Sequence, residues 1–392
     1  MITDNCPCRG CGAHSTDIFF QADCVPTSVG RLETSAAAAR SARCGELNLV
    51  ACHACGLIQN YLYDPEIVGF EPGYQVSLFH SPTFRSFVQG VCDRLIKRYD
   101  LQDKKILEIG CGAAEFLRLL CQQGGNHGVG IDPAVPMEVK ERFDAGSVHL
   151  ISDFYSKQYE HHVGDFVCCL SVFEAIFSPV HFLRSLRKSI GDRDIPVYFE
   201  VFNGYRAIAE SEVWSVHYEQ CNYFSLDSLR NVFALAGFEV THSGTCYEGD
   251  QYLYVEARPS DSGEQTLKLN LPAEFSETVR RFGKEFQTRV DWWQGKLDQC
   301  RRDQKRVVSW GSGGKGISFL SSLSNADVVQ QVVDTNPERQ NHYIPRCGQP
   351  IVDPLDLKQT KPDVVILTNA LYQQEISACL AEMQIECEIV VA

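Results

Sequence analysis

The stretch KKILEIGCGAAEFLRLL, residues 104–120, decides the fold of this chain. Its first half is an apolar run typical of a buried strand, and its second half places apolar residues at helical spacing. Between them, Gly110 and Gly112 predict a tight turn. A strand that runs through a glycine turn into a helix brings backbone amides close to a ligand. We therefore expect a ligand-binding turn at residues 110–112.

The same alternation of strand and helix continues along the chain. Helical patterns lie between several further apolar runs, which predicts a mostly parallel sheet covered by helices on both faces. A charged segment from Pro272 to Gln304 has apolar residues three or four positions apart, so we expect one long amphipathic helix there. Residues 305–392 repeat the alternation on a smaller scale. The apolar runs after the first turn are at residues 127–132, 165–173, 195–202 and 252–259.

The composition narrows the class of protein. The chain has 392 residues, of which 44% are hydrophobic and 22% charged, so it can form two or three domains with large cores. A net charge of -14 without a long basic run disfavours a nucleic acid partner. No apolar run approaches the roughly 20 residues of a membrane span, and the first residues do not resemble a signal peptide. We therefore expect a cytoplasmic protein without a membrane partner.

The cysteines indicate a metal site. Seven of the 18 fall within the first 55 residues, where CRGCG (8–12) and CHACG (52–56) form two C-x-x-C pairs. A glycine after each pair lets backbone amides turn toward a thiolate, and four thiolates suit a closed structural zinc site. Incidental buried thiols are the alternative, and Cys6, Cys24 and Cys44 leave the ligand choice open. The predicted Zn²⁺ ligands are Cys8, Cys11, Cys52 and Cys55.

The first glycine turn follows Glu108, and Asp132 ends the next apolar run. An acidic residue about 20 positions after such a turn accepts hydrogen bonds from ribose hydroxyls. Glu115 stands where a dinucleotide site needs a small residue, which disfavours NAD. The E-x-G-x-G form resembles the motif of class I S-adenosylmethionine methyltransferases, although Ala114 replaces their usual third glycine. The resemblance implies a cofactor site formed by Glu108, Gly110, Gly112, Asp132, Asp153 and Phe154.

The second glycine turn, Gly311 to Gly316, fits G-x-G-x-x-G and is followed by Asp334. It is not a P-loop, because Gly316 stands where a P-loop has Ser or Thr after its lysine. The domain is also about half a full dinucleotide fold, so a complete NAD site would be cramped. Three interpretations stay open: bound NAD, a substrate phosphate or interdomain role for Lys315, and a purely structural turn.

Together these motifs resemble the sugar C-methyltransferases that act on nucleotide-linked keto-deoxysugars. The resemblance covers nearly the whole chain, and its most specific part is the C-terminal order VVSWGSGGKGISFL (307–320), VVDTNPERQNHYIP (332–345) and PDVVILTNALYQQEI (362–376). It implies a zinc-binding module at 1–70, a class I methyltransferase Rossmann-like domain at 71–260, a linking helix at 261–304, and a smaller Rossmann-like substrate domain at 305–392. S-adenosyl-L-methionine and structural Zn²⁺ are the implied cofactors, with a nucleotide sugar as the implied substrate.

The resemblance also places catalytic residues. The family segment Tyr-His-Glu-His, two residues, Tyr-Phe-Ser aligns with HYEQCNYFS at 217–225, so the expected histidine base is Gln220. Glutamine has no titratable proton and cannot act as a general base. In LSVFEAIFSP (170–179), Glu174 matches the family, whereas Ser171 and Ala175 replace frequent histidines. The implied catalytic residues are Tyr74, His217, Glu219 and Gln220, and the implied substrate-binding residues are Tyr223 and Lys315.

Three functions follow as hypotheses. The first is carbon methylation of a nucleotide-linked keto-deoxysugar, in which His217 or Tyr218 partly substitutes for the missing imidazole; His80 is another candidate base. The second keeps the methyl donor but transfers to a sugar oxygen or nitrogen, which demands less of a base. The third is a non-catalytic binding protein, which the retained glycine turn and Asp132 disfavour.

Overall fold

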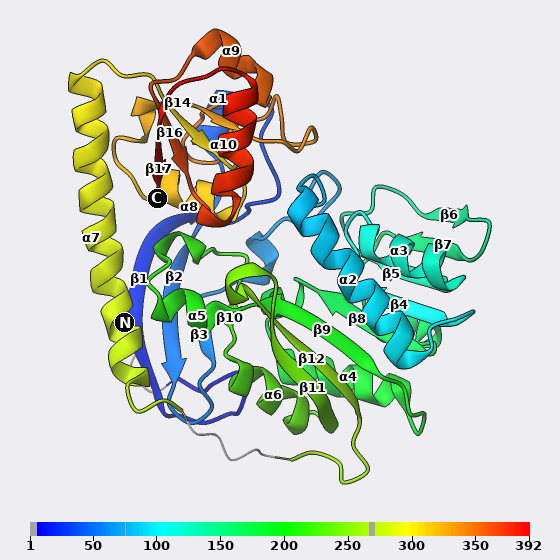
Figure 1. The fold of residues 1–392 in the computed structure, drawn as a ribbon. Coiled ribbons are helices and arrows are strands. Elements are labelled where there is room, and N and C mark those ends of the chain that lie inside the picture. Colours follow the sequence, from blue (N-terminus) through cyan, green and yellow to red (C-terminus); the bar gives the residue numbers. More distant parts are fainter. Residues whose placement is uncertain (1–5, 75, 266–270) are drawn as a thin grey trace.

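The computed structural model describes residues 6–74, 76–265 and 271–392, which form three sheets (Figure 1). The expected α/β fold with a second, smaller Rossmann-like domain is confirmed. Among the described residues, no helix combines the length and the apolar character needed to cross a membrane.

The central sheet has eight strands in the order β11-β12-β9-β8-β4-β5-β7-β6. Strands β7, β5, β4, β8 and β9 are parallel, whereas β12, β11 and β6 run antiparallel to their neighbours. Their bounds are β4 Lys105–Ile109, β5 His127–Ile131, β6 Val139–Arg142, β7 Ser147–Ile151, β8 Phe166–Leu170, β9 Val197–Phe202, β11 Phe238–Cys246 and β12 Tyr252–Pro259.

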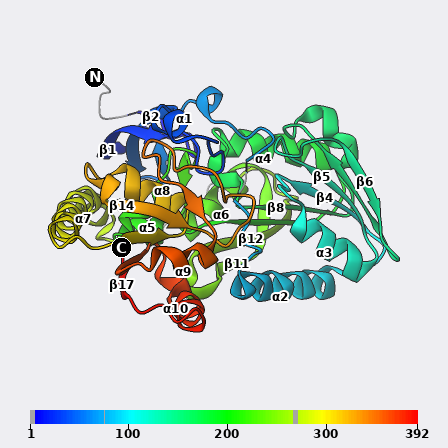
Figure 2. The ribbon, with the colours of Figure 1, turned by 90° about the horizontal axis from the view of Figure 1, so that it is seen from above.

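Helices cover both faces of this sheet, as Figure 2 shows. Helices α2 (Pro82–Tyr99) and α3 (Glu115–Gly124) pack on one face, and α4 (Pro179–Ile190) and α6 (Leu226–Leu235) pack on the other. The strand order reverses between β4 and β8, and parallel α/β sheets bind ligands beyond the carboxyl ends of the strands at such a point. The turn at residues 110–112 lies at this point, directly after β4.

A four-stranded antiparallel sheet joins the N-terminal residues to the middle of the chain. Its order is β1-β2-β3-β10, with β1 Thr16–Pro26, β2 Cys44–Cys52, β3 Ile58–Asn60 and β10 Asn222–Tyr223. A Cys24–Cys44 disulfide links β1 to β2, and the short helix α1 spans Ala36–Arg40. Strand β10 belongs to the segment VWSVHYEQCNYFS (213–225), which carries the predicted catalytic residues His217, Glu219 and Gln220. The N-terminal sheet therefore supports this segment directly.

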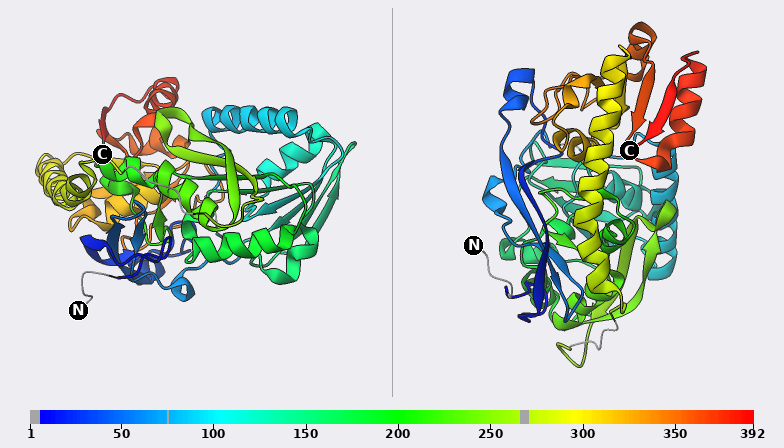
Figure 3. Two further views of the ribbon diagram at one scale, coloured as in Figure 1. Left: turned by 90° about the horizontal axis from the view of Figure 1, so that it is seen from below. Right: turned by 90° about the vertical axis from the view of Figure 1, so that its left-hand side faces the viewer.

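The long helix forms as expected, as α7 (Phe275–Arg302). It runs beside β1 and up to the C-terminal domain (Figure 3). The ring of Phe282 packs edge-on against Phe20 at 5.4 Å, and Trp293 packs edge-on against Phe319 at 5.0 Å. These contacts bury one helix against both the N-terminal sheet and the C-terminal domain, so α7 holds the two parts together.

The C-terminal domain is a five-stranded parallel sheet in the order β15-β14-β13-β16-β17. Its strand order reverses between β13 and β16, at the second glycine turn. The hydroxyls of Tyr372 and Tyr247 share a hydrogen bond of 2.9 Å. The C-terminal domain therefore contacts the middle domain beyond the carboxyl end of β16. The bounds are β13 Val307–Trp310, β14 Val329–Val333, β15 Ile351–Val352, β16 Val364–Leu367, β17 Glu388–Val391, α8 Gly314–Ser321, α9 Leu357–Thr360 and α10 Gln373–Glu382, with α5 Gly204–Ala209 in the middle domain.

Candidate active site

The four predicted zinc ligands come together in the fold. The Sγ atoms of Cys8, Cys11, Cys52 and Cys55 all lie within 4.8 Å of one another. Cys8 and Cys55 are 3.6 Å apart, and Cys11 and Cys52 are 3.7 Å apart. A tetrahedron with Zn–S bonds of about 2.3 Å has edges of about 3.8 Å, so the sulfur positions fit a bound zinc ion.

The local backbone explains this convergence. Gly12 and Gly56 adopt φ values of 76° and 71°, and their amides donate back to the carbonyls of Cys8 and Cys52. The amide of Gly10 points at the Cys8 sulfur at 3.3 Å, as expected for a thiolate. The spare candidates Cys24 and Cys44 pair with each other instead.

Arg9, inside the first C-x-x-C pair, connects the cysteine group to the 213–225 segment. Its guanidinium donates to the carbonyls of Asn60 at 2.8 Å and Cys221 at 3.1 Å, and it lies over the ring of Phe177 at 4.3 Å. Cys221 follows Gln220 directly. Arg9 therefore links the cysteine group to the backbone of the segment that carries Glu219 and Gln220.

The first glycine turn leaves room for a ligand at one glycine only. Gly110 has φ 73°, and a Cβ there would collide with Val172. Gly112 has φ 51°, and a Cβ there would meet no heavy atom within 4 Å among the described residues. Asp132, at the end of β5, accepts the Gly112 amide at 2.8 Å and the Ala134 amide at 2.7 Å. Each carboxylate oxygen keeps a lone pair for a further donor.

Glu108, at the end of β4, is a buried acid behind this turn. Its side chain is 3% exposed, and its Oε2 has no hydrogen-bond partner within the described part of the chain. Burial, with a contribution from the charge of Asp132, raises the pKa of Glu108 well above its ordinary value.

Asp153 and Phe154 lie just beyond the carboxyl end of β7, on the same edge of the sheet. The Asp153 carboxylate accepts from the Phe154 amide at 2.7 Å and from the Tyr159 hydroxyl at 2.6 Å. Phe154 is 61% exposed, which is unusual for a large apolar ring. The predicted role of both residues in the cofactor site stays a prediction.

Tyr74 and Glu219 form the most direct contact among the predicted catalytic residues. The Tyr74 hydroxyl donates to Glu219 Oε2 at 2.8 Å, and the Val29 amide donates to Oε1 at 2.7 Å. Gly30 is needed there, because a Cβ at that position would collide with the Tyr74 ring. Burial, and then the charge of Glu219, raises the pKa of Tyr74 well above its ordinary value, so the phenol keeps its proton.

Arg339, which the sequence analysis did not assign, lies next to this pair. Its guanidinium is buried and donates to the carbonyls of Val29 and Ser312. Burial lowers the pKa of Arg339, whereas the charges of the nearby acids Asp334 and Glu219 raise it. The residue belongs to the NPERQNHY motif, but only the fold reveals that it reaches the Tyr74–Glu219 pair across two domains.

His217 faces the second glycine turn. Its Nδ1 is 2.9 Å from the hydroxyl of Ser318 in α8, and a Cβ at Gly314 would lie 2.7 Å from its Nε2. Burial, and then the charge of Lys315, lowers the pKa of His217 to about 4, so the ring is neutral at pH 7. The close approach that Gly314 permits is therefore used by His217 itself, which favours the interdomain interpretation of this turn over bound NAD.

Tyr223 and Gln220 differ in how their polar atoms are used. The Tyr223 hydroxyl donates to the carbonyl of His217 at 2.9 Å and accepts its amide at 3.1 Å, within a fully buried environment. Tyr223 thus fixes the 217–223 loop, and its predicted substrate contact stays a prediction. The Oε1 of Gln220 is buried without a partner among the described residues.

Lys315 lines a cavity of about 290 Å³ between the middle and C-terminal domains, at the carboxyl ends of β13 and β16. Its ammonium is 3.0 Å from Glu212, which also pairs with Arg206 at 2.6 Å. Gln251 and Thr368 form part of the same wall. The predicted contact between Lys315 and the substrate stays a prediction.

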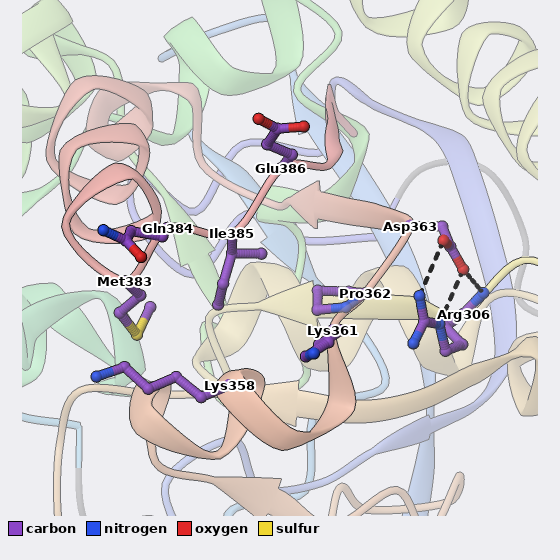
Figure 4. A pocket seen from close by; sticks show the side chains of 9 residues that line it. All are labelled: Arg306, Lys358, Lys361, Pro362, Asp363, Met383, Gln384, Ile385 and Glu386. Carbon is purple, nitrogen blue, oxygen red and sulfur yellow. Dashed lines mark hydrogen bonds and ion pairs between the residues drawn. The ribbon is translucent and has the colours of Figure 1, made fainter.

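A second cavity, of about 340 Å³, lies at the opposite edge of the C-terminal domain (Figure 4). Arg306 and Asp363 pair there at 3.0 Å, at the amino ends of β13 and β16. Lys358, Lys361 and Met383 line another part of it. Ligands of parallel sheets bind at the carboxyl ends, so this cavity does not belong to the candidate active site.

Two family models match this chain. Residues 84–243 match a model described as a methyltransferase domain, and residues 262–391 match one described as a C-methyltransferase C-terminal domain. The protein is therefore an enzyme of the methyltransferase class, with the class I Rossmann-like sheet that the glycine turn predicted. Its C-terminal part is a domain of the kind described for C-methyltransferases. The sequence matches no curated protein.

Several solved methyltransferases resemble part of the chain. Magnesium protoporphyrin IX methyltransferase from Synechocystis PCC 6803 is 15% identical, over 47% of this chain and 89% of that one, with a TM-score of 0.34. A Mesorhizobium loti S-adenosylmethionine dependent methyltransferase is 12% identical, over 44% and 99%, with a TM-score of 0.32. The Burkholderia thailandensis 1,6-didemethyltoxoflavin-N1-methyltransferase is 12% identical, over 46% and 82%, with a TM-score of 0.34. Likeness at this level carries no information about the substrate of this chain.

Proposed function

We propose that this enzyme transfers a methyl group from S-adenosyl-L-methionine to carbon in a nucleotide-linked keto-deoxysugar. The observation that carries the proposal is the Tyr74–Glu219 pair, held in a methyltransferase fold that continues into a C-methyltransferase C-terminal domain. When bound, the sulfonium of the donor supplies an electrophilic methyl group. The Tyr74 hydroxyl has one proton to donate, and when a ketone binds it can turn from Glu219 to the oxygen that becomes negative on enolisation.

The residues of the first glycine turn fit the methyl donor. The open space at Gly112 admits its amino acid end, and Asp132 has acceptor capacity for ribose hydroxyls. Phe154, whose ring is exposed beyond the carboxyl end of β7, would stack against the donor. The Cys8, Cys11, Cys52 and Cys55 sulfurs would hold a structural zinc ion, whose role is to order the N-terminal module.

We further propose that the cavity beside Lys315 receives the nucleotide part of the sugar. Lys315, Arg206 and Arg289 line it, and phosphate oxygens would replace Glu212 as partners of the first two. A cytoplasmic location remains a prediction.

Replacing Gly112 with Ala tests the donor site. The added Cβ occupies the open space, so we expect the affinity for S-adenosylmethionine to fall about tenfold or more, while backbone strain at φ 51° costs about 1–3 kcal/mol of stability. Titration calorimetry and thermal unfolding measure the two effects. Gly110→Ala is the comparison variant, because its Cβ collides with Val172 and should lower stability more. If the wild-type protein binds neither the donor nor S-adenosylhomocysteine, the proposed function is wrong.

The acceptor atom is tested with nucleoside-diphosphate keto-deoxyhexoses deuterated beside the ketone. Carbon methylation requires loss of deuterium from the methylated carbon, which mass spectrometry detects in the product. The competing proposal, transfer to a sugar oxygen or nitrogen, is favoured by the amide at Gln220 and predicts full retention of the label. Retention in a methylated product would therefore replace the carbon acceptor with a heteroatom.

A further inference from the structure

We propose that Glu174 accepts the proton removed from the carbon beside the ketone, in place of the imidazole that this chain lacks at Gln220. The inference rests on the proposed carbon methylation. It assigns a role to an acid that the sequence pattern matched to the family without giving it a function.

Glu174 lies where an acceptor would bind. It belongs to the 3-10 turn Phe173–Ala175, which follows β8 at its carboxyl end. Strand β8 neighbours β4, whose carboxyl end continues into the turn at residues 110–112. The proton acceptor and the predicted methyl donor site thus share the point where the strand order reverses, which is where parallel α/β sheets bind ligands.

The carboxyl of Glu174 has one oxygen unused. Its Oε1 accepts the amide of Phe202, the last residue of β9, at 3.3 Å. Its Oε2 has no hydrogen-bond partner among the described residues, although the side chain is only 4% exposed. An unsatisfied buried oxygen lowers stability, and it leaves Glu174 with an acceptor position that a ligand can use.

The surroundings connect this oxygen to the rest of the site. The Cys221 thiol donates to the Glu174 carbonyl at 3.5 Å, which places Glu174 against the residue that follows Gln220. The amide of Asn203, next to Phe202, donates at 2.8 Å to the carbonyl of Gln251. Gln251 is part of the wall of the cavity beside Lys315. Phe202 and Asn203 thus connect Glu174 to a residue in the wall of the interdomain cavity.

The charges around Glu174 suit a base that works near neutral pH. Burial, and then the charge of Glu200 on β9, raises the pKa of Glu174 to about 7. The other titratable groups facing it are Cys169 of β8, Cys221 and Tyr252 of β12, and burial raises the pKa of each thiol and of this phenol. These three groups are neutral at pH 7, so Glu200 is the one that changes charge together with Glu174.

The proposed step balances without a further reactant. The C–H bond beside the ketone breaks, its proton moves to Glu174 Oε2, and its electron pair forms the enolate, whose oxygen Tyr74 hydrogen-bonds. The enolate carbon then bonds to the methyl group, and the C–S electron pair remains on sulfur. Glu174 finally loses its proton to water.

The test uses Glu174→Gln, which preserves the acceptor for the Phe202 amide but cannot take a proton. The probe is a nucleoside-diphosphate keto-deoxyhexose that the wild-type protein methylates, deuterated beside the ketone. With S-adenosylhomocysteine bound, loss of deuterium to water measures proton removal without methyl transfer. We expect the variant to lose this exchange and the methylation about 100-fold or more, with unchanged affinity for S-adenosylhomocysteine. Adding Gln220→His to the variant is expected to recover part of both rates.

Glu200→Gln is the matched control. Glu200 is also buried with a pKa raised to about 7, first by burial, but its Oε2 already accepts from the Tyr198 hydroxyl at 2.8 Å. The control should keep most of the exchange above neutral pH. In the control, the acidic limb of the pH profile of the exchange rate should move to lower pH, because the negative charge of Glu200 no longer raises the pKa of Glu174. Equal loss in both variants, or undiminished exchange in Glu174→Gln, would overturn the role of Glu174 while wild-type methylation keeps the proposed function intact. Failure of the wild-type protein to methylate any keto-sugar would overturn both.

Discussion

Replacing Cys52 with Ser is expected to remove zinc from the purified protein and to unfold the N-terminal module. Four cysteine sulfurs converge, with Cys52 fully buried, Cys8 and Cys55 each 2% exposed, and Cys11 partly buried. Structural zinc contributes about 10–16 kcal/mol of apparent binding free energy in zinc-finger peptides. The free energy of unfolding of a whole domain is typically about 5–15 kcal/mol. The zinc-binding free energy that the loss of one ligand removes is therefore large enough to unfold the module. Elemental analysis and chemical unfolding measure the two outcomes.

The same change should reach the active site through Arg9. If the first C-x-x-C pair loosens, Arg9 no longer holds the Cys221 carbonyl, and the loop with Glu219 and Gln220 loses a support. We therefore expect a lower methylation rate together with zinc loss. Cys379→Ser is the control, because this half-buried thiol in α10 lies outside the cysteine group and should leave the zinc content unchanged. Full zinc content in Cys52→Ser would show that the ligand set is wrong.

Local patterns sufficed to predict the alternation of strands and helices in the middle and C-terminal parts of the chain, but not the four-stranded N-terminal sheet. The strand, glycine turn and helix at 104–120 depend on neighbours in sequence, and they form β4, the turn and α3 as expected. The long helix α7 follows from its periodicity in the same way. The convergence of Cys8 and Cys11 with Cys52 and Cys55 was predictable because C-x-x-C knuckles have one common geometry.

The candidate site was less predictable, because its contacts join residues far apart in sequence. Glu219 accepts a hydrogen bond from the Val29 amide, and Arg339 donates one to the Val29 carbonyl. No local sequence pattern encodes these two contacts. Sequence placed His217 in the catalytic set, whereas the fold turns its ring toward Ser318. Glu174 follows β8, and one of its carboxylate oxygens accepts the amide of Phe202 at the end of β9. The relative positions of these two strand ends therefore decide which oxygen has no hydrogen-bond partner among the described residues. The family pattern could match this residue but could not reveal an unused hydrogen-bonding position.

The final prediction concerns the effect of pH on stability. The pKa of Glu174 rises from 4.5 to about 7 on folding, chiefly through burial. Between these values the folded state keeps a proton that the unfolded state has lost, so the free energy of unfolding falls as the pH rises. A pKa shift of this size corresponds to about 3 kcal/mol in the free energy of unfolding. This contribution is fully lost above about pH 7. Because Glu200 titrates with Glu174, the measured steps belong to the pair.

Glu174→Gln should remove the part of this fall in the free energy of unfolding that comes from Glu174. Urea unfolding at several values from about pH 5 to about pH 8 is expected to show a flatter curve for the variant than for the wild-type protein. Exposed Glu277→Gln in α7 serves as the control and should leave the slope unchanged. Parallel curves for Glu174→Gln and wild type would mean that Glu174 is ionised at little cost in the fold. A flatter curve combined with lost proton exchange would instead identify an acid that lowers stability and serves the reaction, as expected of a buried catalytic group.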